Sequence, residues 1–355
     1  MAPALKTELH LSLGQTGLLI SGSLVGSVVS LIPWGYATDR FGERWVLAAG
    51  ISGCGIALLG ASQAQGFWEL FALLTVAGAL GASVQSASGR AVMQWFPPRR
   101  RGLALGIRQT AIPLSGFVVS IAMPGIVHAG GVEWGFAALG FACLAGALAG
   151  GLVLREGPER EDGDRPDGPS PFRDPRLWTL SLGSALVLAP QLCVGGFTVI
   201  YLHEEHGLST GDAAAVLAVM QLLAVGGRIF AGRWSDIAAS RIGPLRVIAL
   251  CAAVLVALTA VLTSAPLVLL LPVLVAAGVF SMSWNSLSFA AAIELAGHSR
   301  SGRAIGLQQT FLNLPGAAYP ALFGALVTAT SWRGAFFAVA LFPLAGWRVL
   351  RPLAA

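Results

Sequence analysis

The chain has 355 residues, of which 55% are hydrophobic and only 11% are charged. A soluble domain of this length carries far more charge, so the composition disfavours a water-soluble multi-domain enzyme. The net charge of +5 does not indicate nucleic-acid binding, because the basic residues sit at the ends of apolar runs and form no face with interleaved aromatic residues.

Apolar runs long enough to cross a bilayer as helices follow one another along the chain. Five of them precede the middle of the chain, at 14–34, 46–65, 68–94, 103–127 and 134–154. Six more follow, at 177–201, 211–232, 245–264, 266–292, 304–329 and 333–350. The stretch between the two groups is rich in Asp, Glu, Arg, Pro and Gly, which is the composition of a solvated linker. The sequence therefore predicts an all-α membrane protein with bundles at 1–154 and 177–355, joined by a linker at 155–176.

The two halves of the chain are copies of each other. A shift of 197 positions places Gly35 on Gly232 and Asp39 on Asp236, and a shift of 200 places 102–110 on 302–310. A repeat of this length sets the architecture and predicts two pseudosymmetric helical bundles. The span at 177–201 has no partner in the first half. We therefore expect a truncated chain that lacks one leading helix, with a natural eleven-span protein as the alternative.

Lysine and arginine residues are distributed unequally between the two sides of the predicted spans. Twenty of the 22 fall on one side, and only Lys6 and Arg333 fall on the other. Loops rich in Lys and Arg stay in the cytoplasm. We therefore expect the linker, both repeated hairpins and the C-terminus to be cytoplasmic. The expected protein is a multi-pass monomer in the bilayer of a bacterial cytoplasmic membrane.

The hairpin GYATDRFGER at 35–44 resembles the signature of the major facilitator superfamily, and 232–241 resembles its weaker second copy. The resemblance covers the whole chain. It implies the MFS fold and secondary active transport of a small molecule by alternating access. The chain departs from the family pattern in its absent first helix, in Glu43 where the family usually has a basic residue, and in Ile237 where the second copy often has Arg.

The chemistry of the hairpin agrees with this resemblance. Gly35 lets a neighbouring helix approach closely, and Gly42 permits a left-handed turn. Asp39 is an anion at a level where helix N-termini present positive dipole ends, and the resemblance implies that it braces the N-terminus of the span at 304–329 in the outward-open state. An ordinary polar turn is the alternative for the arginines of the hairpin. The candidate gating residues are Gly35, Asp39, Arg40, Gly42, Arg44, Gly232, Asp236, Arg90 and Glu294.

Transport requires polar groups within the spans, where charge is costly. Arg228 lies two helical turns before Asp236, and this pattern is similar to that of nitrate and monocarboxylate porters, in which an Arg at this point holds the anion. A small organic anion is therefore the candidate substrate, whereas Leu31 at the equivalent position of the first half disfavours nitrate. The alternative for Arg90, Arg108 and Arg228 is that the side chain extends to the lipid headgroups.

Neutral polar residues within the spans complete the candidate substrate site, with hydrogen bonding between helices as the alternative role. Trp284 and Asn285 stand out because an aromatic face and an amide adjoin. The predicted substrate-binding residues are Arg228, Trp284, Asn285, Gln191, Gln221, Gln309, Asn313 and Arg108, and Gln85 is a further candidate.

The sequence contains no nucleotide-binding glycine loop, nucleophile elbow or zinc-spaced histidine pair. We therefore predict no enzyme activity, no cofactor and no metal site, and the four cysteines inside apolar runs are expected to be buried thiols. Acidic residues cluster at span ends, so either protons or a counter-anion remain open as the coupling partner. The alternative function is a non-transporting membrane sensor, or an inactive truncated fragment, on the same fold.

Overall fold

The computed structural model describes residues 13–154, 170–297 and 300–354, so most of the predicted linker lies outside the described residues. Within this described part there is no strand, and ten helical stretches are long and apolar enough to cross a membrane. These ten, together with the 29-residue helix α2 (Leu13–Phe41), coincide with the predicted spans. The predicted all-α membrane architecture is confirmed.

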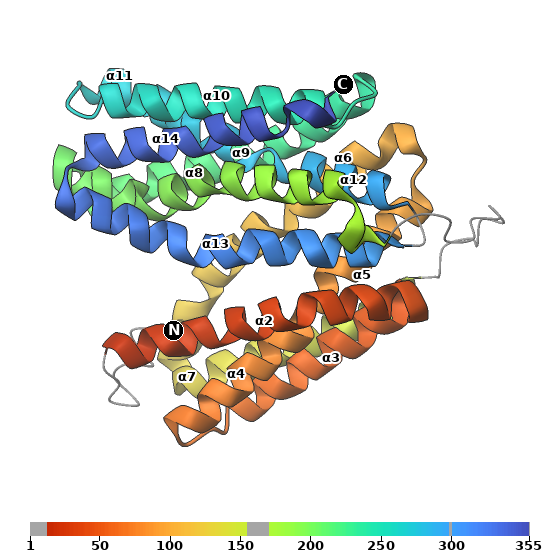
Figure 1. Cartoon of the computed structure of the whole chain (residues 1–355). Helices are drawn as coiled ribbons and strands as arrows, with labels where there is room; N and C mark the ends of the chain where they lie inside the picture. The colour runs from red at the N-terminus through yellow and green to blue at the C-terminus, as the bar shows by residue number, and fades with distance from the viewer. Residues whose placement is uncertain (1–12, 155–169, 298–299, 355) are drawn as a thin grey trace. The chain divides into compact units, whose positions relative to one another are not determined.

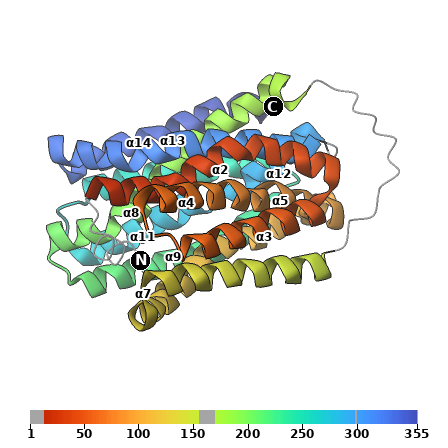
Figure 2. The ribbon, with the colours of Figure 1, turned by 90° about the horizontal axis from the view of Figure 1, so that it is seen from below.

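The chain forms two compact units, and the first contains Met1–Trp95, Leu114–Pro171 and Ala296–Thr310. Its helices are α2, α3 (Glu43–Ala61), α4 (Phe67–Gly81), α5 (Ser83–Trp95), most of α7 (Ala111–Val153) and the first turns of α13 (Ser301–Ala329). Helix α2 packs along α4, and α3 packs against α4 on another side (Figures 1 and 2). Apolar side chains including Leu19, Leu70 and Phe136 fill the space between these helices.

The second unit contains Phe96–Pro113, Phe172–Leu295 and Phe311–Ala355. The short helix η2 (Pro171–Arg173) stands at the boundary between the two units. The helices of the second unit are η1 (Pro98–Arg100), α6 (Arg101–Gln109), α8 (Pro175–His206), α9 (Thr210–Ile237), α10 (Ile242–Val261), α11 (Leu267–Met282), α12 (Asn285–Ala296), the rest of α13, α14 (Trp332–Val349) and η4 (Arg351–Leu353). Helix α14 lies against α10 and α8, as Figure 1 shows. The hydrophobic core of the second unit includes the aromatic residues Tyr201, Phe323, Trp332 and Phe336.

The segments 96–113 and 296–310 do not pack with the repeat to which they belong in the sequence. Segment 96–113 lies in the first half of the chain but packs within the second unit, and segment 296–310 does the reverse. These are also the segments that the 200-residue shift relates to each other. The contiguous domain boundaries at 154 and 177 therefore stay a prediction.

Three of the predicted spans are interrupted helices. Helix α4 gives way to α5 at Ala82, and α11 gives way to α12 at Ser283 and Trp284, which are corresponding positions in the two repeats. Helix α6 ends at Gln109 and α7 begins at Ala111. In transporters, discontinuous helices at corresponding positions of two repeats point to the binding site.

Candidate functional site

The carboxylate of Asp39 lies at the N-terminus of α13. Its Oδ1 accepts a hydrogen bond from the Gly302 backbone N–H at 2.9 Å, and its Oδ2 accepts from the Arg303 backbone N–H at 3.2 Å. The Arg303 guanidinium adds a third bond, from Nε to Oδ2 at 2.9 Å. A carboxylate here satisfies donors that have no partner within the helix and interacts favourably with the positive end of the helix dipole. This arrangement, which we name the Asp39 clamp, confirms the predicted partner of Asp39.

Backbone contact between α2 and α13 accompanies the Asp39 clamp. A Cβ atom at Gly35 would lie 2.6 Å from the Gly302 carbonyl oxygen, and one at Gly302 would lie 2.6 Å from the Gly35 carbonyl oxygen. One turn further along, a Cβ atom at Gly306 would lie 2.6 Å from the Leu31 carbonyl oxygen. Real Cβ contacts are never this short, so larger residues would push the helices apart. The predicted close approach at Gly35 is confirmed.

Arg90 extends toward the same clamp. Its Nη1 donates to the Thr38 carbonyl at 2.9 Å and lies 3.5 Å from Asp39 Oδ1. Its Nε lies 3.7 Å from Oε2 of Glu43, a carboxylate that is fully buried. Two carboxylates and two guanidinium groups, those of Arg90 and Arg303, therefore gather at the end of α2, where their charges balance.

The other hairpin residues occupy different places. Gly42 adopts φ 78°, which confirms the predicted left-handed backbone at the α2–α3 turn. Arg44 donates from Nε to the Gly151 carbonyl at 3.0 Å, and the guanidinium of Arg40 lies over the Phe41 ring. Neither arginine contacts the Asp39 carboxylate in the interactions recorded for the described chain, so their gating role stays a prediction.

A second clamp repeats the first within the other unit. Asp236, in the last turn of α9, accepts hydrogen bonds from the backbone N–H groups of Gly102 and Leu103, both at 2.9 Å. These residues form the first turn of α6, and the backbones of Gly102 and Gly232 are in direct contact. We name this arrangement the Asp236 clamp. Its donors and acceptor correspond, through the repeat, to those of the Asp39 clamp.

The arginine that pairs with Asp236 does not occupy the position in the repeat that corresponds to Arg303 of the Asp39 clamp. Arg241 donates from Nη1 to Asp236 Oδ1 at 2.6 Å and to Ser235 Oγ at 2.7 Å. Its Nε donates to Glu294 Oε1 at 3.0 Å. Arg303 plays the corresponding part in the Asp39 clamp, whereas the equivalent position in α6 is Leu103. Each clamp therefore has a cation, although the residue that supplies it differs.

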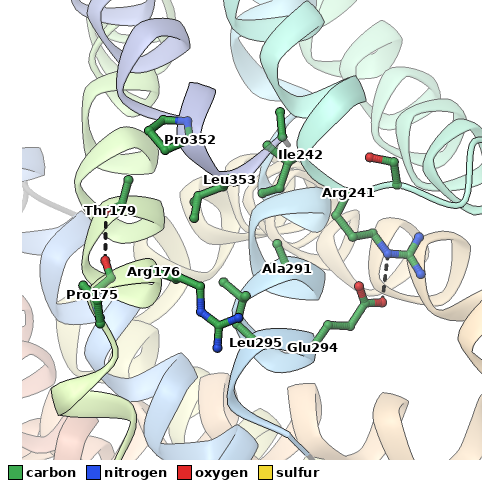
Figure 3. A pocket seen from close by; sticks show the side chains of 12 residues that line it. Pro175, Arg176, Thr179, Arg241, Ile242, Ala291, Glu294, Leu295, Pro352 and Leu353 are labelled. Atoms are coloured by element: carbon green, nitrogen blue, oxygen red, sulfur yellow. Dashed lines mark hydrogen bonds and ion pairs between the residues drawn. The ribbon is translucent and has the colours of Figure 1, made fainter.

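A pocket of about 560 Å³ opens beside the Asp236 clamp. The first turns of α8, the α9–α10 turn, the end of α12 and η4 line it. Figure 3 shows Arg241 paired with Glu294 on one side and Arg176 on the other. Arg241 thus links this pocket to the clamp, because it lines the pocket and pairs with both Glu294 and Asp236.

Arg228 is a buried arginine of the second unit, with 3% of its surface exposed. Its Nε donates to the Met282 carbonyl at 2.8 Å, and its Nη1 donates to the Gln109 carbonyl at 2.8 Å. These carbonyls end α11 and α6, so two negative helix-dipole ends face the guanidinium. None of the ion pairs of the described chain involves Arg228. Among the described residues, its Nη2 makes no hydrogen bond.

The remaining predicted substrate residues are placed as follows. Asn285 donates from Nδ2 to Gln191 Oε1 at 3.3 Å, so these two amides are brought together within the second unit. Trp284 is fully buried at the α11–α12 break, and its Nε1 has no hydrogen-bond partner among the described residues. Arg108 donates to the side chain of its neighbour Gln109 at 3.2 Å. Gln309 is buried, and Gln85, Gln221 and Asn313 are partly buried.

Sequence reasoning missed the backbone groups that complete the Asp236 clamp and the site of Arg228. The first turn of α6 supplies the N–H donors to Asp236, and the carbonyls of Gln109 and Met282 hold Arg228. One signal was available, because 102–110 and 302–310 match so closely. Two glycines in each of these segments permit the backbone contacts with α9 and α2.

Comparisons with known proteins agree with this architecture. The family model for the Major Facilitator Superfamily matches residues 1–317. An uncharacterized MFS-type transporter of Mycobacterium tuberculosis is 35% identical over 350 residues, which cover 97% of this chain and 78% of the relative. A hexuronate transporter of Bacillus subtilis is 26% identical over 117 residues, which cover 33% of this chain and 28% of that protein. The fucose:proton symporter FucP of Escherichia coli has a TM-score of 0.77 at 16% identity, covering 98% of this chain and 93% of that one, a likeness of fold.

Proposed function

The chain belongs to the Major Facilitator Superfamily, and we propose that it carries a small organic anion across the membrane by alternating access. The family and the membrane-length helices make it a multi-pass integral membrane protein of transmembrane transport. In our proposal the two clamps lie on the cytoplasmic side of a bacterial cytoplasmic membrane, and the unequal distribution of arginines supports this orientation. The C-terminus lies on the same side.

The observation that carries the anion proposal is the environment of Arg228. A guanidinium within the bilayer is costly unless it is neutralised, and here the described partners are carbonyl groups rather than carboxylates. The planar guanidinium offers five N–H donors in a fork that matches a carboxylate, and Nη2 has no partner among the described residues. A substrate carboxylate would supply the missing negative charge.

The name of one relative also supports an anionic substrate. The B. subtilis protein that matches one third of the chain is a hexuronate transporter, and hexuronates are small organic anions. The sugar acid glucuronate is therefore a reasonable probe, and glucose is its neutral counterpart. The two molecules differ in the carboxylate that Arg228 would bind.

The clamps supply the gating part of the proposal. Each fixes a helix N-terminus through a single carboxylate, so each is a contact that can break and re-form as a unit. In the proposed cycle both clamps are closed while the cytoplasmic side is closed, and both open when substrate is released inward. The other predicted substrate residues, Gln191 and Asn285 among them, are proposed to line the path within the bilayer.

The test is substrate counterflow in proteoliposomes, which needs no knowledge of the coupling ion. Liposomes containing the protein are loaded with a panel of unlabelled carboxylates, including glucuronate, and uptake of each labelled carboxylate is measured. We expect at least one carboxylate to exchange and its neutral counterpart to be inactive. Arg228→Ala should abolish exchange, because the guanidinium that holds the carboxylate is gone.

The matched control is Arg233→Ala, which removes an exposed arginine five residues further along the same helix. We expect this variant to exchange at close to the wild-type rate. Exchange of a carboxylate that persists in Arg228→Ala would refute the assignment of Arg228. Exchange of neutral compounds alone would refute the anion class while leaving the transport function in place.

A further inference from the structure

We infer that Arg228 also positions helix α6, because it supplies the hydrogen-bond donor that Pro113 withholds from the Gln109 carbonyl. This role goes beyond the proposed function and stands whether or not an anion binds. It makes Arg228 a positioning residue for the segment that the Asp236 clamp holds. The residues of α6 and α9 that contact one another all lie within the second unit.

The first step concerns the carbonyl group of Gln109. In a continuous helix this carbonyl would accept from the backbone N–H of residue 113, but residue 113 is proline and has no N–H. Gln109 is 3% exposed, so water does not readily replace the missing donor. A buried carbonyl without a partner is destabilising. Arg228 Nη1 takes the place of that donor with a bond of 2.8 Å.

The second step is that α9 holds α6 at both ends. Asp236 binds the N–H groups that begin α6, and Arg228 binds the carbonyl that ends it. The distance along the helix axis from Arg228 to Asp236 is about 12 Å and that from Gly102 to Gln109 about 10.5 Å, at a rise of about 1.5 Å per residue. The two charges therefore match both ends of the short helix. The Asp236 carboxylate lies at the positive end of the α6 dipole, and the Arg228 guanidinium lies at its negative end.

The surface between these two contacts is backbone against backbone. Gly102 touches Gly232, and a Cβ atom at Gly106 would lie 2.7 Å from the Arg228 carbonyl oxygen. A side chain at either glycine would separate the helices. The backbone of Arg228 thus contacts α6 directly, and its side chain reaches the end of the same helix.

The third step uses the other repeat as an internal control. The counterpart of Gln109 is Gln309, and four residues later stands Asn313, which has a backbone N–H. Helix α13 runs without interruption through this point. The position equivalent to Arg228 is Leu31. Proline and arginine therefore occur together at this contact, although they come from different halves of the chain, and both are absent from the equivalent positions 313 and 31, as expected if each requires the other.

This positioning role connects the proposed anion site to the Asp236 clamp. An anion that draws the guanidinium away from Gln109 releases the end of α6, while Asp236 still holds its beginning. The connection between the anion site and the clamp rests on the proposed function, whereas the dependence of α6 on Arg228 is independent of it.

Amide hydrogen exchange, measured by mass spectrometry on the full chain in nanodiscs, tests the inference. The variants are Arg228→Leu, which introduces the residue of the first repeat, Pro113→Asn, which introduces the residue found four positions after Gln309, and the double variant. We expect Arg228→Leu to raise exchange across 102–110 by about tenfold or more, since the loss of a hydrogen bond to a charged group is of this size. The double variant should return to within about twofold of wild type, because the asparagine that replaces Pro113 supplies the missing N–H.

Two controls guard against general unfolding. Exchange across 302–309, which has its own N–H donor, should not change in any variant, and Arg228→Lys, which keeps a cationic donor, should fall between wild type and Arg228→Leu. Exchange across 102–110 that is unchanged in Arg228→Leu would overturn the inference. So would a double variant that exchanges as fast as the single one.

Carboxylate counterflow by the double variant then separates the two roles of Arg228. If α6 recovers its slow exchange while counterflow stays lost, Arg228 both positions α6 and binds the anion. If counterflow returns together with slow exchange, the positioning role stands and the assignment of Arg228 to the anion fails.

Discussion

Ala239 occupies the position in the second hairpin that corresponds to Gly42 in the first hairpin. A substitution there tests whether the second hairpin also favours glycine at this position. Ala239 is the one residue other than glycine in the described chain with a positive φ, 47°. Its environment is a Schellman-type helix end, in which Ser240 N–H donates to the Ser235 carbonyl at 3.2 Å. Glycine is the residue that such a position favours. We predict that Ala239→Gly stabilises the protein.

The magnitude follows from two opposing terms. A left-handed backbone costs an L-residue with a Cβ atom roughly 1–2 kcal/mol, and this cost disappears in the variant. Glycine restricts more conformational freedom on folding, which costs roughly 0.5–1 kcal/mol. Ala239 is exposed, so loss of its methyl group removes no packing. The net gain in the free energy of unfolding is about 0.5–1 kcal/mol, which corresponds to a rise of about 1–4 °C in the unfolding midpoint of a unit of this size.

The assay is thermal unfolding of the purified protein in detergent, at a fixed heating rate. The matched control is Ala238→Gly, one residue earlier. Ala238 is also exposed but has φ −71° and ψ −7°, which are ordinary right-handed values. In Ala238→Gly no backbone strain is relieved, so only the loss of conformational freedom on folding remains. We therefore expect the unfolding midpoint to fall. A fall of equal size in both variants would refute the argument from backbone strain.

Two further predictions concern acidic residues of the second unit. Asp236→Asn removes the charge that binds the N–H groups of Gly102 and Leu103, so exchange of these amides should accelerate by about tenfold or more, since each such bond contributes roughly 1.5–3 kcal/mol; unchanged exchange there would contradict the Asp236 clamp. Burial raises the pKa of Asp174, but its hydrogen bonds to Arg176 and the charge of that residue outweigh burial and hold the pKa below its ordinary value. A carboxyl group whose pKa is lowered by folding adds stability above the unfolded pKa of about 3.9, and this stability is lost as the pH falls through the folded pKa. Asp174→Asn keeps an acceptor at the start of α8, so the difference in unfolding midpoint between about pH 5 and about pH 3 should shrink, and an equal acid-dependent loss in both proteins would contradict this.

The family resemblance made the first clamp predictable from the sequence. It implied that Asp39 braces the N-terminus of the span that forms α13. The glycine at position 35 indicated close packing for the same reason. Hydropathy likewise placed the helices, because burial in lipid requires long apolar runs.

The exact positions of the breaks within the spans were not predicted, since hydropathy counts apolar residues and ignores backbone hydrogen bonds. The break at Thr110 had a readable cause in Pro113, which withholds a donor from the residue four positions earlier. The source of the cation in each clamp was also missed. Arg44 and Arg241 occupy equivalent positions, yet only Arg241 contacts an aspartate among the interactions described, because Arg303 already occupies that place beside Asp39.

The way Arg228 is neutralised has a consequence for how solution acidity acts on the protein. Arginine keeps its proton at every physiological pH, and the carbonyl groups opposite it have no proton to gain or lose. This centre therefore holds a constant charge where an arginine–carboxylate pair would titrate. A change of transport rate with acidity would report the ionisation of the transported molecule or of another group, and not of the Arg228 guanidinium.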